Sequence, residues 1–454
     1  MSSDWSLVKI DDLKADEKGA IAIGPFGSRM KSDCYVESGI PVIRGTNITG
    51  GANFEGDFVY ITEEKADTLG SSNVYQYDLV FPHRGAIGEV GIVLKDERYV
   101  LSSSLMKLTC NREKVNPKFL YYFFKSRIGR HELLKNASQV GTPGIGQPLS
   151  SLKSIELKLP SKKEQDEIDK ILTSIEEKIE LNRETNQTLE NIAQAIFKSW
   201  FVDFDPARAK IAGKENGQDP ELSAMAAIAG KTIEELAALS DEQSEKLKQT
   251  AALFPDSLID SELGQIPEGW EARNFGDVSS CFDSKRIPLS KKQRQEKKPG
   301  HIPYYGATSV MDYVNEWIFD DIYLLLGEDG SVVKENGTPF VQYIWGKSWV
   351  NNHAHVLQGK NGVSTEQLMI FIQSQNIASY VTGAVQLKLN QKNMNSIPFL
   401  DAGEELNKRF HELITPLYQI LRAKSEENKT LEELRESLLP KLLSGTIAGV
   451  GVDG

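Results

Sequence analysis

The sequence lacks the features that mark secreted, membrane-spanning and zinc-stapled proteins. Its three cysteines, Cys34, Cys110 and Cys281, lie far apart and form no Cys-x-x-Cys pair, which argues against a disulfide scaffold or a structural zinc site. No apolar run approaches the ~20 residues that a membrane helix needs. The first residues have neither the basic nor the apolar region of a signal peptide. We therefore expect a cytoplasmic protein.

Signatures of catalysis are missing as well. The sequence has no Walker A loop, no Asp/Asn-Pro-Pro-Tyr/Phe tetrapeptide of adenine methyltransferases and no His-Glu-x-x-His motif. His353 and His355 have the spacing of two metal ligands on a strand, but the sequence offers no apparent third ligand. We predict no catalytic residue, no metal site and no cofactor bound by this chain. A stand-alone methyltransferase is disfavoured.

Acidic residues outnumber basic ones, and they are unevenly distributed. The formal net charge is −12, yet residues 203–264 hold 13 acidic and 6 basic side chains while residues 265–400 hold 13 of each. A neutral domain can bind phosphate where its cations cluster, so the overall charge does not exclude DNA as a partner. With 454 residues, the chain is long enough for two to four folding units.

The chain contains an internal repeat. Asn186-Gln-Thr-Leu-Glu190 returns 242 residues later as Asn428-Lys-Thr-Leu-Glu432. The segment that begins at Trp5 has a weaker echo at Trp270. Each half therefore reads as a large mixed domain followed by a long helix.

Both predicted helices have the spacing of a coiled-coil seam, in steps of three and four residues. The first seam is predicted at Ile168, Ile171, Ile175, Ile179, Asn182, Asn186, Leu189, Ala193, Ile196 and Trp200. The second is predicted at Phe410, Leu413, Leu417, Ile420, Lys424, Asn428, Leu431, Leu434 and Leu438. Each stripe needs an apolar partner, and the other helix is the nearest. Pro416 is expected to kink or restart the second helix.

The asparagines at the centre of the predicted seam allow two interpretations. A buried asparagine in a seam lowers stability but fixes register and orientation. Alternatively, these positions are partly open to water. The sequence leaves both interpretations standing.

Glycine-punctuated loops supply candidate DNA contacts, because Arg and Lys bind guanine and phosphate while Asn and Gln pair with adenine. In the first domain the candidates are Arg29, Lys31, Arg44, Thr46, Asn47, His83 and Arg84. In the second they are Lys285, Arg286, Lys291, Lys292, Tyr305, Thr308, Asn351, Asn352, His353, Gln386 and Lys388. Seven cations between residues 284 and 300 accompany one acid, Glu296, and predict a local positive field. Loops that are basic for solubility alone are the alternative.

Several segments resemble a known family. Ile196-Phe-Lys-Ser-Trp-Phe-Val-Asp-Phe-Asp-Pro206 is similar to the central conserved region of type I restriction–modification specificity subunits. Gly264-Gln-Ile-Pro-Glu-Gly-Trp270, Ile302-Pro-Tyr-Tyr-Gly-Ala-Thr308 and Leu438-Leu-Pro-Lys-Leu-Leu-Ser-Gly445 resemble further family segments. The resemblance implies an α+β fold in which two α/β target recognition domains are separated by an antiparallel pair of long coiled-coil helices, with a pseudo-two-fold internal repeat.

With the repeat, the resemblance divides the chain into six parts. We predict a first recognition domain at 1–155, a first conserved helix at 156–202 and an acidic, Ala-rich helical spacer at 203–264. A second recognition domain is predicted at 265–399, a second conserved helix at 400–445 and a flexible tail at 446–454.

The resemblance also implies a function. Each domain would read one half of an interrupted DNA target, while the helices set the spacing and dock two modification subunits that methylate adenine with S-adenosylmethionine. Two restriction subunits that use ATP and Mg would join them. Subunit docking would involve the seam, at Ile175, Ile179, Asn182, Asn186, Leu189, Ile196, Trp200, Leu417, Asn428, Leu431 and Leu438. A non-catalytic scaffold that binds proteins instead of DNA is the competing hypothesis.

Overall fold

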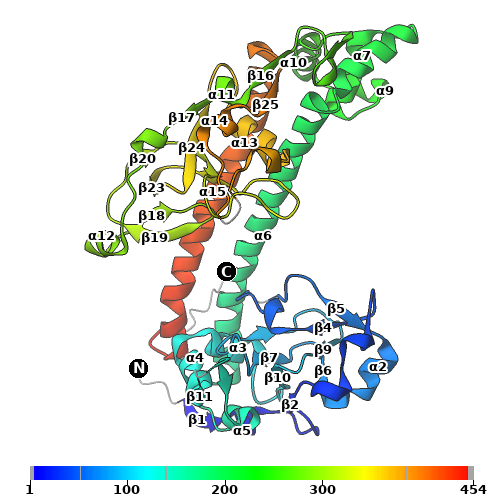
Figure 1. The fold of residues 1–454 in the computed structure, drawn as a ribbon. Helices are drawn as coiled ribbons and strands as arrows, with labels where there is room; N and C mark the ends of the chain where they lie inside the picture. The colour runs from blue at the N-terminus through cyan, green and yellow to red at the C-terminus, as the bar shows by residue number, and fades with distance from the viewer. Residues whose placement is uncertain (1–4, 52, 139–140, 384–385, 448–454) are drawn as a thin grey trace. The chain divides into compact units, whose positions relative to one another are not determined.

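A computed structural model of the chain describes residues 5–51, 53–138, 141–383 and 386–447. It divides into two compact units, one of Met1–Asn182 with Glu426–Gly454 and one of Arg183–Ser425. Both division points fall inside the longest helices, α6 (Lys162–Phe201) and α15 (Glu404–Leu443), which are continuous ribbons in Figure 1. Most of the predicted tail, 448–454, lies outside the described residues.

Among the described residues, no helix combines the length and the apolar character that a membrane span requires.

The first recognition domain is built on two sheets. One has the strand order β2-β10-β7-β8 and the other the order β3-β5-β4-β9-β6, in which β4 and β9 run parallel. The strands are β2 (Ile21–Ile23), β3 (Tyr35–Val36), β4 (Ile40–Ile43), β5 (Val59–Ile61), β6 (Asn73–Val74), β7 (Leu79–Pro82), β8 (Gly91–Ile92), β9 (Tyr99–Leu101) and β10 (Leu105–Leu108). The ends of the domain are joined by β1 (Ser6–Lys9), which pairs antiparallel with β13 (Glu156–Leu159).

Short helices pack against the two sheets. They are α1 (Ile10–Leu13), α2 (Glu63–Thr68), α3 (Pro117–Lys125), α4 (Arg127–Leu134) and α5 (Pro148–Lys153), with a β11–β12 pair (Ala137–Ser138, Gly144–Ile145) between α4 and α5. Helix α3 is capped at its start by Asn116, whose side chain accepts hydrogen bonds from the backbone of Lys118 and Phe119. Phe124 of α3 meets Phe81 of β7 edge to face at 4.9 Å and shares a buried cluster with Leu172 of α6.

The second unit repeats this plan (Figure 1). Its sheets have the orders β17-β24-β21-β22 and β19-β18-β23-β20, with β18 and β23 parallel, and β16 pairs antiparallel with β25. The elements are β16 (Glu271–Asn274), α11 (Phe275–Val278), β17 (Ser279–Cys281), α12 (Lys291–Glu296), β18 (Ile302–Tyr305), β19 (Val310–Val314), β20 (Phe319–Asp320), β21 (Tyr323–Gly327), β22 (Val341–Ile344), β23 (Lys347–Val350), β24 (Ala354–Gly359), α13 (Thr365–Ser374), α14 (Gln391–Asn395) and β25 (Pro398–Asp401).

Before this domain lies a small helical insertion. It comprises α7 (Asp205–Glu215), α8 (Pro220–Ala229), α9 (Ile233–Leu236), α10 (Asp241–Ala252) and the hairpin β14 (Leu258–Ser261)–β15 (Gly264–Pro267). Capping boxes at Thr232 and Ser240 start α9 and α10. Phe254 packs edge to face on Trp200 at 5.3 Å and fixes the insertion to α6.

Within the first unit, α6 and α15 pack antiparallel around buried asparagines. Asn182 Nδ2 donates to Asn428 Oδ1 at 2.8 Å, and Asn428 Nδ2 donates to the Ile179 carbonyl at 3.2 Å. Asn182 is fully buried. Because the donor of each amide has a specific partner, sliding the helices would strand buried polar groups, which favours the interpretation that these residues fix register.

Within the second unit, the same two helices meet through aromatic and polar contacts. Phe410 of α15 is fully buried, and its ring centroid lies 5.1 Å from that of Phe201 and 5.9 Å from that of Trp200. Asn186 Nδ2 donates to Ser425 Oγ at 3.0 Å. Leu189, Ile196 and Leu417 are partly buried against this cluster.

The predicted register of the second seam is wrong over part of its length. Leu413, Ile420 and Leu434 are 44%, 45% and 43% exposed, whereas Ile414, Tyr418 and Leu421 are buried. Helix α15 carries apolar residues on two adjacent stripes, and only the tertiary contacts decide which stripe is covered. Pro416 does not interrupt the helix.

Candidate nucleic-acid interface

In the second domain, four loops come together where β18, β21 and β23 end. We call residues 305–308, 328–330, 351–353 and 382–383 with 386–389 the reading loops of this domain. Backbone hydrogen bonds join them, from Asn351 to Tyr305 at 3.1 Å, from Glu328 to His353 at 2.8 Å and from Leu389 to Glu328 at 2.8 Å. A further bond runs from the Gly330 N–H to the Leu387 carbonyl at 2.9 Å.

The first domain forms the same frame from residues 43–46, 83–85, 102–104 and 141–145, its own reading loops. Here Ser102 donates to Ile43, His83 to Ser104 and Ile145 to His83, each at 2.9 Å. Gly85 donates to the Pro143 carbonyl, also at 2.9 Å. All four bonds have a counterpart in the second domain, so the duplication extends to individual hydrogen bonds.

The side chains on the two frames differ. The bridge between Arg84 and Gly144 in the first domain corresponds to the bridge between Asp329 and Lys388 in the second. Ser103 corresponds to Asn352, whereas Thr46 keeps its identity at Thr308. One backbone frame therefore carries two sets of hydrogen-bonding groups, as two readers of different base sequences require.

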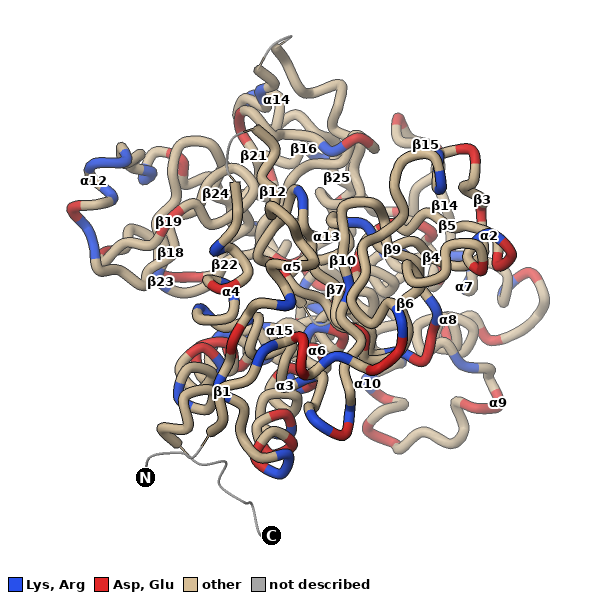
Figure 2. Tube along the Cα trace, turned by 90° about the horizontal axis from the view of Figure 1, so that it is seen from below, with Lys and Arg blue, Asp and Glu red and all other residues tan. Residues whose placement is uncertain are grey.

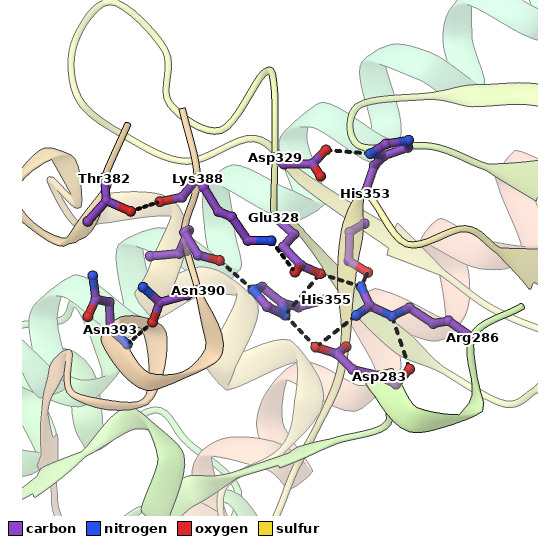
Figure 3. Close-up of polar contacts among 12 residues, drawn as sticks. Asp283, Arg286, Glu328, Asp329, His353, His355, Thr382, Lys388, Asn390 and Asn393 are labelled. Carbon is purple, nitrogen blue, oxygen red and sulfur yellow. Dashed lines mark hydrogen bonds and ion pairs between the residues drawn. The ribbon is translucent and has the colours of Figure 1, made fainter. Parts of the chain in front are cut away.

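In the second domain, the frame gathers several of the predicted DNA-binding residues. Thr308, Asn352, Gln386 and Lys388 are exposed on the reading loops, and Tyr305 lies at the base of the first loop. His353 is partly exposed and its Nδ1 contacts the Asp329 carboxylate (Figure 3). These residues stay candidates for base contact.

The basic segment around α12 is a separate element, marked by its Lys and Arg residues in Figure 2. Arg294 and Lys298 form ion pairs with Asp312, at 3.0 and 2.6 Å, so part of the predicted field is neutralised. Lys285 lies over the ring of Phe282 at 5.0 Å. Lys291 and Lys292 are exposed and enter no ion pair with the described part of the chain.

Two candidates of the second domain need correction. Asn351 is buried, where its Oδ1 accepts from the His353 N–H at 2.8 Å, so the amide shapes the loop instead of facing solvent. Arg286 is enclosed by acceptors: Glu328 and the Ala354 carbonyl lie 2.7 and 2.6 Å from its Nη1. Its charge is compensated by acceptors inside the domain, so its guanidinium is not available to DNA.

The first domain shows a similar division. Arg29, Lys31, Thr46 and Arg84 are exposed, with Thr46 and Arg84 on the reading loops. Arg29 and Lys31 belong to the segment after β2, where Arg29 Nη2 donates to the Thr68 carbonyl at 2.7 Å. They stay candidates for phosphate or base contact.

Three candidates of the first domain also have internal roles. Asn47 is buried and its Nδ2 donates to the carbonyls of Glu55 and Asp57 at 2.8 and 3.2 Å, while Arg44 Nη2 donates to the Asp57 carbonyl at 2.5 Å. His83 Nε2 lies 3.1 Å from the Ser103 carbonyl, and burial lowers the pKa of this imidazole. As with Asn351, sequence reasoning recognised groups that can read bases but not the backbone groups that occupy them.

Beneath the reading loops of the second domain lies a buried ion network that the sequence did not reveal (Figure 3). His355 on β24 contacts Asp283 through Nδ1 at 2.5 Å and the Leu389 carbonyl through Nε2 at 2.7 Å. Arg286 bonds Asp283 at 3.3 Å, and Lys388 bonds Glu328 at 3.4 Å. Two acids and three basic side chains from four segments are thus joined.

The fold places Cys281 and Asp283 beside His355, a grouping that the sequence did not indicate. Donor atoms of Cys281, Asp283 and His355 lie within 4.8 Å of one another. A metal would need a lone pair on the imidazole, yet both ring nitrogens of His355 face oxygen acceptors. Burial lowers the pKa of His355, but the bonds to Asp283 and Cys281 outweigh it and raise the pKa to about 9. The geometry fits a protonated imidazole better than a metal ligand.

Residues 3–191 and 267–431 match the family described as type I restriction modification DNA specificity domain. The chain belongs to this specificity family. It is 31% identical to the HindI specificity subunit of Haemophilus influenzae, over 77% of this chain and 82% of the relative. It is 24% identical to the MjaIX specificity subunit of Methanocaldococcus jannaschii, over 98% of this chain and 94% of the relative.

The fold of this specificity chain is similar to a crystal structure of a type I restriction–modification S subunit from M. genitalium. The TM-score is 0.54 at 16% identity, with 97% and 96% of the two chains covered. The predicted family and fold class are confirmed. The chain is a non-catalytic subunit that recognises DNA, and the scaffold hypothesis is not favoured.

Proposed function

We propose that the two domains read the two halves of an interrupted DNA target through their reading loops. The observation that supports this most directly is the duplicated frame, in which four backbone hydrogen bonds recur while the exposed side chains differ. Such a frame lets the side chains, and therefore the bases, change without rebuilding the loops. Asn352 and Gln386 would form hydrogen bonds with adenine, and Arg84 would bind guanine or phosphate.

The proposal includes a spacing role for α6 and α15. Each helix runs for 40 residues without interruption, which corresponds to roughly 60 Å at ~1.5 Å per residue. Each domain also holds its helices through buried polar contacts. In the first unit, Tyr122 donates to Glu176 of α6 at 3.1 Å, and in the second, Tyr343 donates to Glu366, 3.5 Å from Arg422 of α15. A molecular ruler would need each domain to be held on its helix in this way.

The remaining partners belong to the same proposal. The long helices carry four apolar residues that are 42 to 45% exposed, namely Ile192, Leu413, Ile420 and Leu434. Such exposed apolar residues suit docking of two modification subunits. These subunits would hold S-adenosylmethionine and methylate adenine N6. Two restriction subunits would hold ATP and Mg and cut DNA. We place this activity in the cytoplasm, where such a complex meets incoming DNA.

Exchange of one domain tests the half-site assignment. Residues 1–160 are replaced by those of another family member, a boundary that keeps β1 paired with β13. The chimera and the parent are expressed with their modification subunits, and methylated adenines are mapped by single-molecule sequencing. One half of the bipartite motif should change while the other half stays.

The reciprocal chimera, exchanged over residues 270–401, serves as the matched control and should alter the other half. A change in both halves from either exchange would refute the modular assignment. Absence of salt-dependent DNA binding by the complex would instead favour the protein scaffold.

A further inference from the structure

His355 lies beneath the fourth reading loop of the second domain, residues 382–383 with 386–389. Its side chain is 1% exposed. Nδ1 lies 2.5 Å from Asp283 Oδ2, and Nε2 lies 2.7 Å from the Leu389 carbonyl oxygen. Both partners are acceptors, so both ring nitrogens must donate, and only the imidazolium form of histidine carries two N–H groups.

Four charged side chains surround His355, and they come from three neighbouring segments of the domain. Asp283 and Arg286 follow β17, Glu328 follows β21, and Lys388 comes from the reading loop itself (Figure 3). The Cys281 thiol lies within 4.8 Å of a donor atom of Asp283 and of His355. With the imidazolium present, the two carboxylates face three cations, and loss of its proton would place a lone pair against either the Leu389 carbonyl or Asp283.

This contact bears on the shape of the loop. The Leu389 backbone is held on both sides, because its carbonyl accepts from His355 and its N–H donates to the Glu328 carbonyl at 2.8 Å. One residue earlier, Lys388 exchanges backbone hydrogen bonds with Thr382 at 2.8 and 2.7 Å, which closes the loop. Gln386 and Lys388 therefore depend on the anchor at Leu389 for their position.

Among its described residues, the first domain has no such anchor. Strand pairing places Met106 of β10 opposite Phe81, as His355 of β24 lies opposite Leu326. The Glu328 position is taken by His83, which is buried and whose pKa is lowered. The two domains share a backbone frame but differ in what supports the last loop, so the first domain is an internal reference.

We propose that His355, as an imidazolium joined to Asp283, is a positioning residue that holds Leu389, and with it residues 386–388, in place for reading, and that base selection by the second domain alone depends on its proton. The inference rests on the proposed half-site function.

The direction of the pH dependence follows from the raised pKa. The pKa of His355 rises from its ordinary value of 6.5 to about 9 in the folded chain. Its contribution is therefore complete below pH 6.5, declines as the pH rises and is lost above about pH 9. Recognition by the second domain should fail over that upper range while the first domain keeps its half of the motif.

The test uses the complex with its modification subunits and, as the probe, fragmented unmethylated genomic DNA. Methylation is run at about pH 7.5 and about pH 10, and modified adenines are mapped. In the parent complex, discrimination in the second half-site should fall by about tenfold or more at high pH, with the first half-site unchanged. His355→Met, which copies the first domain, should show that loss at both pH values. Met106→Leu is the matched control and should behave as the parent.

Asp283→Asn gives an independent readout and does not require the His355 variant to fold. Without the carboxylate, the pH midpoint of second-half discrimination should move down by a unit or more, as His355 returns toward its ordinary pKa. An unmoved midpoint, or equal second-half discrimination at both pH values in the parent, overturns the inference. Failure of the proposed function looks different, because the parent would then show no bipartite motif at pH 7.5.

Discussion

Lengthening both helices by whole heptads tests the ruler. One seven-residue heptad is inserted between Asn182 and Asn186 in α6, and another between Ser425 and Asn428 in α15. The insertion level is set by the contact of Asn182 with Asn428 and of Asn186 with Ser425. Because seven residues return to nearly the same helix face, the buried stripe continues through the insertion.

The expected displacement follows from helix geometry. Seven residues at ~1.5 Å add roughly 10 Å, which equals about three base pairs at ~3.4 Å each. Three base pairs also rotate the far half-site by roughly 100° about the DNA axis, at ~10.5 base pairs per turn. A single heptad should therefore lengthen the preferred unread spacer and weaken binding, since distance and rotation cannot both be matched.

Three heptads separate these two effects. They add roughly 32 Å, close to the ~34–36 Å of one DNA turn, so distance and rotation are restored together. We expect a preferred spacer about nine or ten base pairs longer and binding near that of the parent. The assay selects bound or methylated targets from a library with randomised spacers. Insertion into α6 alone is the control and should abolish paired recognition.

An unchanged spacer preference in both matched insertions would refute the reasoning, because the half-site distance would then be set by something other than these helices. A continuous change in spacer without the weakening at one heptad would refute the rotational part only.

Two further predictions concern charge and packing. If Lys291 and Lys292 each contact a phosphate, replacing both by Ala should lower the slope of log affinity against log salt by roughly two. A slope equal to that of the parent in salt titrations of the complex would mean that α12 serves solubility. Phe410→Ala should destabilise the second unit by about 3–5 kcal/mol, because a fully buried ring between Phe201 and Trp200 is removed. Leu413→Ala, which alters a half-exposed neighbour on α15, should lower the free energy of unfolding by less than about 1 kcal/mol. Urea unfolding followed by tryptophan fluorescence compares the two variants. Equal losses would mean that Leu413 belongs to the buried seam, as the sequence predicted.

The sequence predicted the duplication and the helices well because both depend on local pattern. Asn182 and Asn428 were recognised by their place in a repeating apolar stripe. The seam at Leu413 and Ile420 was misassigned because α15 is apolar on two sides. Periodicity alone cannot distinguish the stripe that packs on α6 from the stripe that stays exposed.

Side-chain roles at the interface were harder to predict for a different reason. Asn47, Asn351 and Arg286 have the chemistry of base readers, but each is held by the backbone: Asn47 and Arg286 donate to carbonyls of other segments, and Asn351 accepts from the His353 N–H. The His355 network joins residues 72 and 34 positions apart, and no local pattern encodes such contacts. The positions that stay exposed, Asn352 and Gln386 among them, are those whose side chains the frame does not use.

This difference bears on how specificity can change in such a chain. Where reading loops are joined by backbone hydrogen bonds, as between His83 and Ser104, any side chain compatible with the turn keeps the frame. The first domain should therefore accept new exposed residues freely. In the second domain, the last loop is anchored by the side chains of His355 and Asp283, so a substitution there changes the support as well as the reader. Retargeting the second half-site is expected to succeed at Asn352 and Gln386, which lie on the reading loops, and to fail at His355, which lies beneath them.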